Sequence, residues 1–297
     1  MCPETGDILV PEFGRAAMTD WSRRQVANLV GLKWDRWFEG ADSATRATEM
    51  NARFARADDR VKLRTRRVID SDTGPTTELR ALVSPGYVPV SDAELAWGIA
   101  DALERHDPEA TLIRHAATDR SLSFVVKVGR AFVPGRTETE VGECWGSLFV
   151  MNSGVGYCSV RILSYLVRLL CKNGMTAPLK DPVLLRSAHR GNVQSKIAKG
   201  VTESLPRLAE DLHVAYRRLA ASLAVRVGSA GEAIADFLRL AKLPLKLAPR
   251  IVEAYQAEPN PSAFGIAQAV TRAAQSLSPE ERFLLERAAG QYLSNLN

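Results

Sequence analysis

One continuous stretch, residues 142–175, constrains the fold more than any other part of the sequence. Residues 145–151 form a nearly uninterrupted apolar run of strand length, which is typical of a strand buried on both faces. A glycine-containing turn, NSGVGY, follows at residues 152–157. Apolar and polar residues alternate over residues 157–162, which favours a neighbouring strand. Leucines then recur over residues 163–170 at spacings that suit a buried helix. We therefore expect strand, turn, strand and helix in this order.

Four further strands and one helix are expected around this stretch. The strands cover residues 61–69, 78–83, 111–116 and 122–128, and the helix covers residues 92–106. Ser91 and Glu94 have the spacing of a capping box at the start of this helix. These elements predict an α+β core over residues 60–179, with a largely antiparallel sheet and helices on one face.

The two flanks are expected to be helical. Residues 1–59 form a helical N-terminal segment in which a helix, a turn at Gly31 and a second short helix give the outline of a helix-turn-helix. The alternative is an ordinary amphipathic helical hairpin with Trp34 and Trp37 in its core. Residues 180–297 form a C-terminal region that begins with a polar, basic connector and continues as helices.

Composition and cysteine usage are those of a globular protein without a membrane span. The chain is 46% hydrophobic and 25% charged, and no apolar run approaches the roughly 18 residues that a spanning helix needs. The first residues show neither the basic start nor the apolar run of a secretory signal. The four cysteines form no CxxC pair, so we expect reduced thiols in a cytoplasmic protein.

Positive charge is unevenly distributed along the chain. The net charge is +5, and residues 144–199 contain eight basic residues and one acid, Asp181. Because this part of the chain is also strongly apolar, its cations must gather on one side of packed elements, as a phosphate backbone would require. In the strand over residues 61–69, three further cations alternate with less polar residues. Glu78 lies across the expected hairpin and could pair with part of this row.

These patterns give a set of candidate nucleic-acid contacts. The basic candidates are Lys62, Arg64, Arg66, Arg161, Arg168, Lys172, Arg186, Arg190, Lys196 and Lys199. Tyr87 and Tyr157 are candidates for stacking on bases if the nucleic acid is single-stranded. For each basic residue the alternative is an ordinary solvated surface charge.

The sequence shows no pattern of catalytic or metal-binding residues. The four histidines are scattered, and none lies three or four residues from another histidine or a cysteine. The GVG at residues 154–156 lacks the third glycine of a dinucleotide-binding loop, and no phosphate-binding GxxxxGK[ST] pattern occurs. Cys158 and Cys171 lie in apolar runs, where a thiol is usually inert. We therefore expect a protein that is not an enzyme and holds no cofactor or metal.

Several segments together resemble a family of phage- and plasmid-borne proteins catalogued as a domain of unknown function. They are DWS near residue 20, LRALVSPGYVPVSDAEL, NSGVGY, SVRI, LVRLLCKNGM, PSAFGIAQAVTRAA and ERAAGQYL. The resemblance covers roughly residues 19–292, with one departure: Pro85 and Gly86 stand where the family more often has Asp-Arg. It implies a mobile-element setting and supplies no catalytic residues.

Three functions remain open at this stage. The leading hypothesis is a non-catalytic, nucleic-acid-binding accessory protein of a phage, prophage or plasmid, and single-stranded DNA binding and annealing is one form of this role. DNA is favoured over RNA as the partner, and the protein is expected to self-associate into a homo-oligomer. The alternative is a structural or regulatory oligomerising protein of the element without a nucleic-acid role, in which the basic residues scatter over several faces. A hydrolase or nuclease would need three or more Asp, Glu and His side chains to converge in one cleft.

Overall fold

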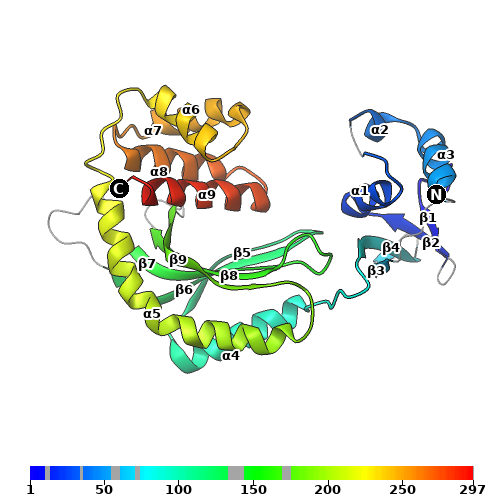
Figure 1. Ribbon diagram of the computed structural model, residues 1–297, viewed down its shortest axis with the longest axis horizontal. Coiled ribbons are helices and arrows are strands. Elements are labelled where there is room, and N and C mark those ends of the chain that lie inside the picture. The colour runs from blue at the N-terminus through cyan, green and yellow to red at the C-terminus, as the bar shows by residue number, and fades with distance from the viewer. Residues whose placement is uncertain are drawn as a thin grey trace.

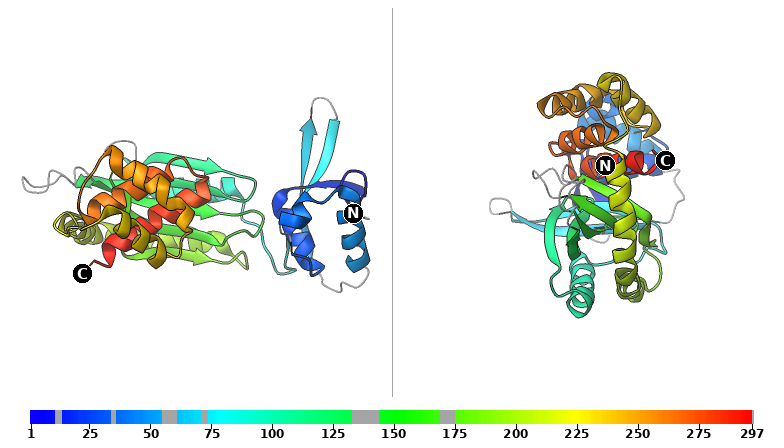
Figure 2. Two further views of the ribbon diagram at one scale, coloured as in Figure 1. Left: turned by 90° about the horizontal axis from the view of Figure 1, so that it is seen from above. Right: turned by 90° about the vertical axis from the view of Figure 1, so that its left-hand side faces the viewer.

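The computed structural model shows a mixed α+β fold built on two β-sheets. It describes residues 1–10, 14–33, 36–54, 61–70, 74–132, 144–168 and 175–296. The smaller sheet, with the N-terminal helices, lies to one side of the larger sheet and its helices (Figures 1 and 2). Among the described helices, none is both long and apolar enough to cross a membrane.

The smaller sheet joins N-terminal strands to the predicted basic hairpin. Its strands are β1 (Ile8–Val10), β2 (Gly14–Met18), β3 (Lys62–Asp70) and β4 (Gly74–Val83). Their order is β1-β2-β4-β3, with β2 parallel to β4 and the other pairs antiparallel. The hairpin is confirmed, but it pairs with β2 and not with the larger sheet. The boundary expected after residue 59 therefore falls inside a unit that shares one sheet.

Three helices cover this sheet, and the prediction of a wholly helical N-terminus is corrected. The helices are α1 (Asp20–Leu29), α2 (Arg36–Gly40) and α3 (Ser43–Phe54). Ala16 and Met18 of β2 are buried with Val26, Phe38 and Met50 in one small core. Strands β1 and β2 were not predicted. Strand β2 pairs with β4, some 60 residues later in the sequence, and a local pattern does not reveal such a distant partner. Only the first half of a helix-turn-helix is matched, because α2 has five residues.

The larger sheet is an antiparallel meander, as predicted for the core. Its strands are β5 (Thr111–Ala117), β6 (Leu122–Phe132), β7 (Cys144–Asn152), β8 (Val160–Arg168) and β9 (Met175–Ser187), in that spatial order. The predicted strand at residues 145–151 is confirmed as β7. The predicted helix is confirmed as α4 (Asp92–His106), with the Ser91 side chain accepting a hydrogen bond from the Glu94 backbone N–H.

Two predictions around β8 and β9 are wrong. The leucine-rich segment after residue 162 continues β8, and the basic connector expected from residue 180 belongs to β9. Leu163 and Tyr165 are buried on one face of β8, while Ile162 and Leu166 are buried on the other. A strand buried on both faces loses the two-residue alternation, so its leucine spacing also fits a helix. Helical structure in the C-terminal region therefore starts only at α5 (Val193–Ala221).

Helices cover both faces of the larger sheet, which corrects the prediction of one covered face. Helices α4 and α5 pack on the face that carries Val126 and Leu148. Helix α9 (Pro279–Ser294) packs on the opposite face, where Phe283 stacks on Phe149 with ring centroids 4.2 Å apart. The remaining helices are α6 (Ala230–Leu240), α7 (Ala248–Ala257) and α8 (Ala263–Ala274), with the short 3₁₀ helix η2 (Leu245–Leu247) between α6 and α7.

Candidate functional site

The NSGVGY turn lies where the two sheets meet, and its first two side chains bind neighbouring segments. The Asn152 amide donates to the Val90 carbonyl at 3.0 Å and to the Asp92 carboxylate at 2.6 Å. The Ser153 hydroxyl donates to the Arg120 carbonyl at 2.7 Å. Both side chains are buried. The turn thereby fixes the start of α4 and the β5–β6 turn against the end of β7.

Backbone groups of the same turn bind the smaller sheet and its first helix. The Trp21 indole N–H donates to the Val155 carbonyl at 3.3 Å, and the Arg64 guanidinium donates to the Gly154 carbonyl at 3.4 Å. Gly156 has a φ of 72°, a left-handed conformation that glycine adopts at little cost. The polar groups of NSGVGY thus join neighbouring segments of the fold.

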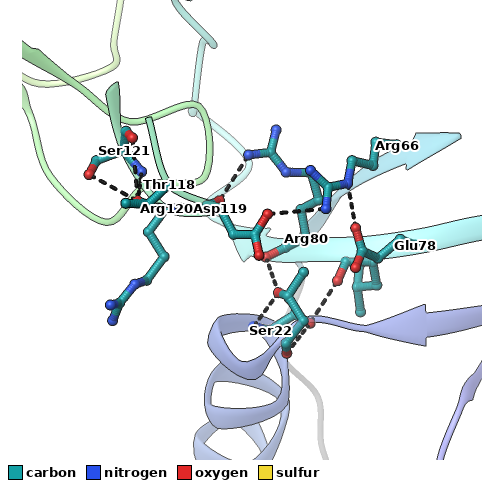
Figure 3. A network of polar contacts seen from close by, with 10 residues as sticks. Ser22, Arg66, Glu78, Arg80, Thr118, Asp119, Arg120 and Ser121 are labelled. Carbon is teal, nitrogen blue, oxygen red and sulfur yellow. Dashed lines mark hydrogen bonds and ion pairs between the residues drawn. The ribbon is translucent and has the colours of Figure 1, made fainter. Parts of the chain in front are cut away.

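The β5–β6 turn, residues 118–121, makes the second link between the two sheets (Figure 3). Arg66 on β3 pairs with Glu78 on β4, as predicted across the hairpin, and also with Asp119 at 3.1 Å. Arg80 donates to the Asp119 carbonyl at 2.9 Å. On the other side of the turn, the buried Glu280 carboxylate of α9 accepts from residues 118 and 121.

The predicted row of three cations on β3 is therefore divided between different partners. Arg66 has two carboxylate partners and Arg64 donates to a backbone carbonyl, whereas Lys62 is exposed. A register shift between Arg64 and Thr65 also interrupts the regular pairing of β3 with β4. Arg66 acts here as a link between the sheets, and its charge is already balanced.

The two candidate stacking tyrosines have their rings covered by protein. Tyr87 is 9% exposed, stacks on His189 with centroids 4.9 Å apart, and donates its hydroxyl to the Ser153 carbonyl. Tyr157 is half-buried between the edge of Trp21, at 5.2 Å, and the Arg120 guanidinium, at 5.1 Å. This geometry does not support base stacking at either ring.

The structure brings two of the predicted basic residues together near the end of β9, and two more follow soon after in the chain. Arg161 on β8 and Arg186 on β9 stand directly opposite each other in the sheet register. The Arg161 guanidinium donates to the Ser159 hydroxyl at 3.2 Å, and the Arg186 side chain is exposed. Arg190 follows in the exposed turn after β9, and Lys196 is exposed in the first turns of α5. We call these four basic residues the β9 corner.

The other basic candidates lie apart from this corner or outside the described part. Lys199 is exposed on α5 and pairs with Glu203 at 3.7 Å. Lys172 and the Arg168 side chain lie outside the described residues, as do the Trp34 and Trp37 side chains. The candidates thus occupy both sheets and α5, and they do not share a single face of one sheet.

Two titratable groups behind the NSGVGY turn are held in their neutral forms by burial. Burial lowers the pKa of His189 below its ordinary value of 6.5, although a hydrogen bond to the Cys158 carbonyl opposes the shift. Burial raises the pKa of the Cys158 thiol to about 11. A thiol with this pKa is a poor nucleophile at neutral pH, which agrees with its expected inert role.

A polar cavity of about 470 Å³ opens beside the link formed by the β5–β6 turn. Three carboxylates line it, and each is paired with an arginine: Asp20 with Arg23, and both Glu78 and Asp119 with Arg66. Throughout the described segments, no group of three His, Cys, Asp or Glu side chains is arranged to hold a metal ion. Each carboxylate of the cavity wall therefore already has an arginine partner.

Sequence reasoning missed several residues that connect the two sheets. The Trp21 side chain contacts Val155, 134 residues later in the chain, and Asp119 is contacted by Arg66 and Arg80, 53 and 39 residues earlier. A short-range pattern carries no information on such pairs. Only the NSGVGY turn, with its two glycines and small polar residues, signalled an unusual backbone at this place.

Comparison with known proteins gives a family and no function. A family profile described as "Domain of unknown function (DUF932)" matches residues 81–242, from the end of β4 through α6 and just beyond it. A search of curated proteins and a search of solved structures each return no match. The matched region contains the larger sheet, the NSGVGY turn and the β9 corner.

Proposed function

This chain belongs to the DUF932 family, and we propose that it binds the phosphate backbone of a nucleic acid at the β9 corner. The observation that carries the proposal is the direct cross-strand opposition of Arg161 and Arg186. Directly opposite side chains on neighbouring antiparallel strands have Cβ atoms about 4.5–5.5 Å apart, and like charges at this distance destabilise the sheet. An anion bound between them would remove that repulsion.

The surroundings of the pair support an anionic partner. Among the described residues, none of the four β9-corner side chains forms an ion pair with a carboxylate. Leu185 packs against Gly200 of α5, with its Cβ 3.4 Å from where a Cβ on Gly200 would lie. Successive side chains of a strand point to opposite faces, so Arg186 points to the face away from α5. The corner therefore presents cations on one sheet face, at a turn and on α5, a spread that suits an extended polyanion better than a small one.

The proposal is narrower than the sequence-based hypothesis. It leaves out Arg66, whose charge is balanced, and the two tyrosines, whose rings are covered. It keeps a non-catalytic accessory role in a mobile element and a cytoplasmic location, and it favours single-stranded DNA. The wider distribution of basic residues is what the alternative, an oligomerising protein without a nucleic-acid role, would predict.

Fluorescence anisotropy with labelled single-stranded and double-stranded DNA over a salt series tests the proposal. The test variant is Arg161→Ala with Arg186→Ala. The matched control is Arg53→Ala with Arg272→Ala, two exposed arginines that pair with carboxylates on α3 and near α8 and whose loss changes the net charge equally. Each lost phosphate contact reduces the steepness of log affinity against log salt by about 0.7 for a single strand. The test variant loses two contacts, so we expect its slope to be less steep than that of the wild type by about 1.4.

The outcomes separate the two functions. A weaker, less salt-dependent test variant beside an unchanged control supports binding at the β9 corner. Equal weakening in both variants would indicate only a general effect of net charge. Absence of binding by the wild-type protein at low salt would contradict the proposal and favour the oligomerising role.

A further inference from the structure

An apolar groove opens between α4 and the edge of the larger sheet. It has a volume of about 650 Å³, and Ile99 and Leu103 of α4 line one side of it. Leu112 of the edge strand β5 also lines the groove and is 58% exposed. Glu104 and Asp107 also line it and carry negative charge, and the Glu104 side chain is exposed. The groove is thus a mainly apolar surface that also carries two acidic residues.

A segment elsewhere in the same chain has the opposite charge and the same apolar character. Leu240 at the end of α6 is 77% exposed, and Leu245 at the start of η2 is 57% exposed. Lys242 and Lys246 stand next to them and are exposed. No ion pair involves either lysine within the described part of the chain. We call residues 240–246 the leucine-lysine knob.

We propose that the leucine-lysine knob of one copy docks into the α4–β5 groove of a second copy. Leu240 and Leu245 would cover apolar groove residues while Lys242 and Lys246 approach Glu104 and Asp107. The knob cannot reach the groove of its own chain, because α4 and α6 lie on opposite sides of the larger sheet in Figure 1 and in the right view of Figure 2.

Such a contact uses two different surfaces, and this determines the kind of assembly. After two copies dock, the copy that supplied its knob still has a free groove, and the copy that supplied its groove still has a free knob. Contacts of this kind add copies head to tail, and they end in a ring only if the rotation between copies closes. The proposal does not depend on nucleic-acid binding, because no residue of the β9 corner belongs to either surface.

Sedimentation velocity of the full-length protein over a range of concentrations tests the contact. We expect wild-type protein to form species larger than a monomer as its concentration rises. Leu112→Asp in the groove and Leu240→Asp with Leu245→Asp in the knob should each raise the apparent Kd of self-association at least about tenfold. The control is Leu284→Asp on α9, which is 49% exposed and belongs to neither surface, and it should assemble as wild type does.

Mixing the two blocked variants gives the decisive result. The Leu112→Asp protein keeps its knob and the doubly substituted protein keeps its groove, so an equimolar mixture should form a 1:1 dimer and no larger species. A wild-type protein that stays monomeric overturns the proposal. So does a mixture that forms no dimer, or blocked variants that assemble like wild type. Circular dichroism of each variant confirms that the exposed substitutions leave the fold intact.

Discussion

Glu286 has the most buried side chain of the carboxylates that form ion pairs in the described part of the chain, and replacing it should destabilise the protein more than replacing any of the others. Glu286 lies on α9 with its side chain only 2% exposed. Arg114 on β5 donates to both of its carboxylate oxygens at 2.8 Å, and Arg282 donates to one of them at 2.8 Å. The three side chains fix α9 on the sheet beside the stacked phenylalanines.

The expected size of the effect follows from what Glu286→Ala leaves behind. Removing one partner of a buried ion pair typically costs about 3–5 kcal/mol, because the remaining charge is buried without a partner. Arg114 and Arg282 are 25% and 21% exposed, so water reaches part of each guanidinium. We therefore expect the lower end, about 3 kcal/mol. For a domain of 150–250 residues this corresponds to a decrease in Tm of about 6–12 °C.

Urea unfolding followed by tryptophan fluorescence measures this change, with Glu253→Ala as the control. Glu253 is an exposed carboxylate on α7, where a surface substitution should change stability by no more than about 0.5 kcal/mol. A loss below about 1 kcal/mol for Glu286→Ala, the size of an exposed salt bridge, would refute the reasoning.

A combined substitution separates the unpaired charges from lost packing. Replacing Glu286 with leucine and both arginines with methionine removes all three charges together. Replacing a whole buried charge cluster with apolar residues is often neutral or stabilising, so this variant should recover most of the lost stability. If this triple variant is as unstable as Glu286→Ala, the stability is lost through altered side-chain packing and not through unpaired charges.

Three further predictions concern single residues. Gly265→Ala should destabilise the protein by at least about 2 kcal/mol, because the new Cβ would overlap the Asn260 backbone carbonyl at the start of α8. As the control, Gly98→Ala on α4 places its Cβ in open space and should stabilise the protein by about 0.5–1 kcal/mol. Thermal unfolding of both variants measures the two changes. Burial lowers the pKa of His189 in the folded protein, so as the pH drops the unfolded chain takes up this proton before the folded protein does. The free energy of unfolding should therefore decrease as the pH drops below 6.5. Urea titrations at several pH values measure this dependence, which His189→Gln should weaken. Because burial raises the pKa of Cys158 from 9.0 to about 11, its alkylation at neutral pH should be at least about tenfold slower in the folded protein than in urea, as measured by mass spectrometry of its peptide.

The sequence predicted those elements whose own residues determine them. The α4 helix has a serine cap and a regular apolar stripe, and β7 is a short apolar run between turns. The part of β8 after residue 162 was predicted as a helix because burial on both faces removes the alternation by which strands are identified. Arg114 and Glu286 are 172 residues apart, and only the folded sheet and α9 bring them together.

Local turn chemistry also accounts for the residues Pro85 and Gly86. These two exposed residues occupy the middle of a turn in which the Tyr87 backbone N–H donates to the Ser84 carbonyl at 3.0 Å. Proline suits the second position of such a turn because its φ is already fixed near the required value. Pro85 and Gly86 therefore form a tight turn in the path of the chain from β4 towards α4.

The placement of the NSGVGY turn decides where function has to be sought. Its Asn152 and Ser153 side chains and the carbonyls of Gly154 and Val155 bind other segments, so the groups that join the two sheets are already engaged. A ligand at this turn would have to displace contacts that hold the sheets together. The β9 corner, the knob and the groove carry exposed side chains, and a partner can reach them while the junction stays intact. The turn therefore fixes the fold, and these exposed surfaces are where we propose that partners bind.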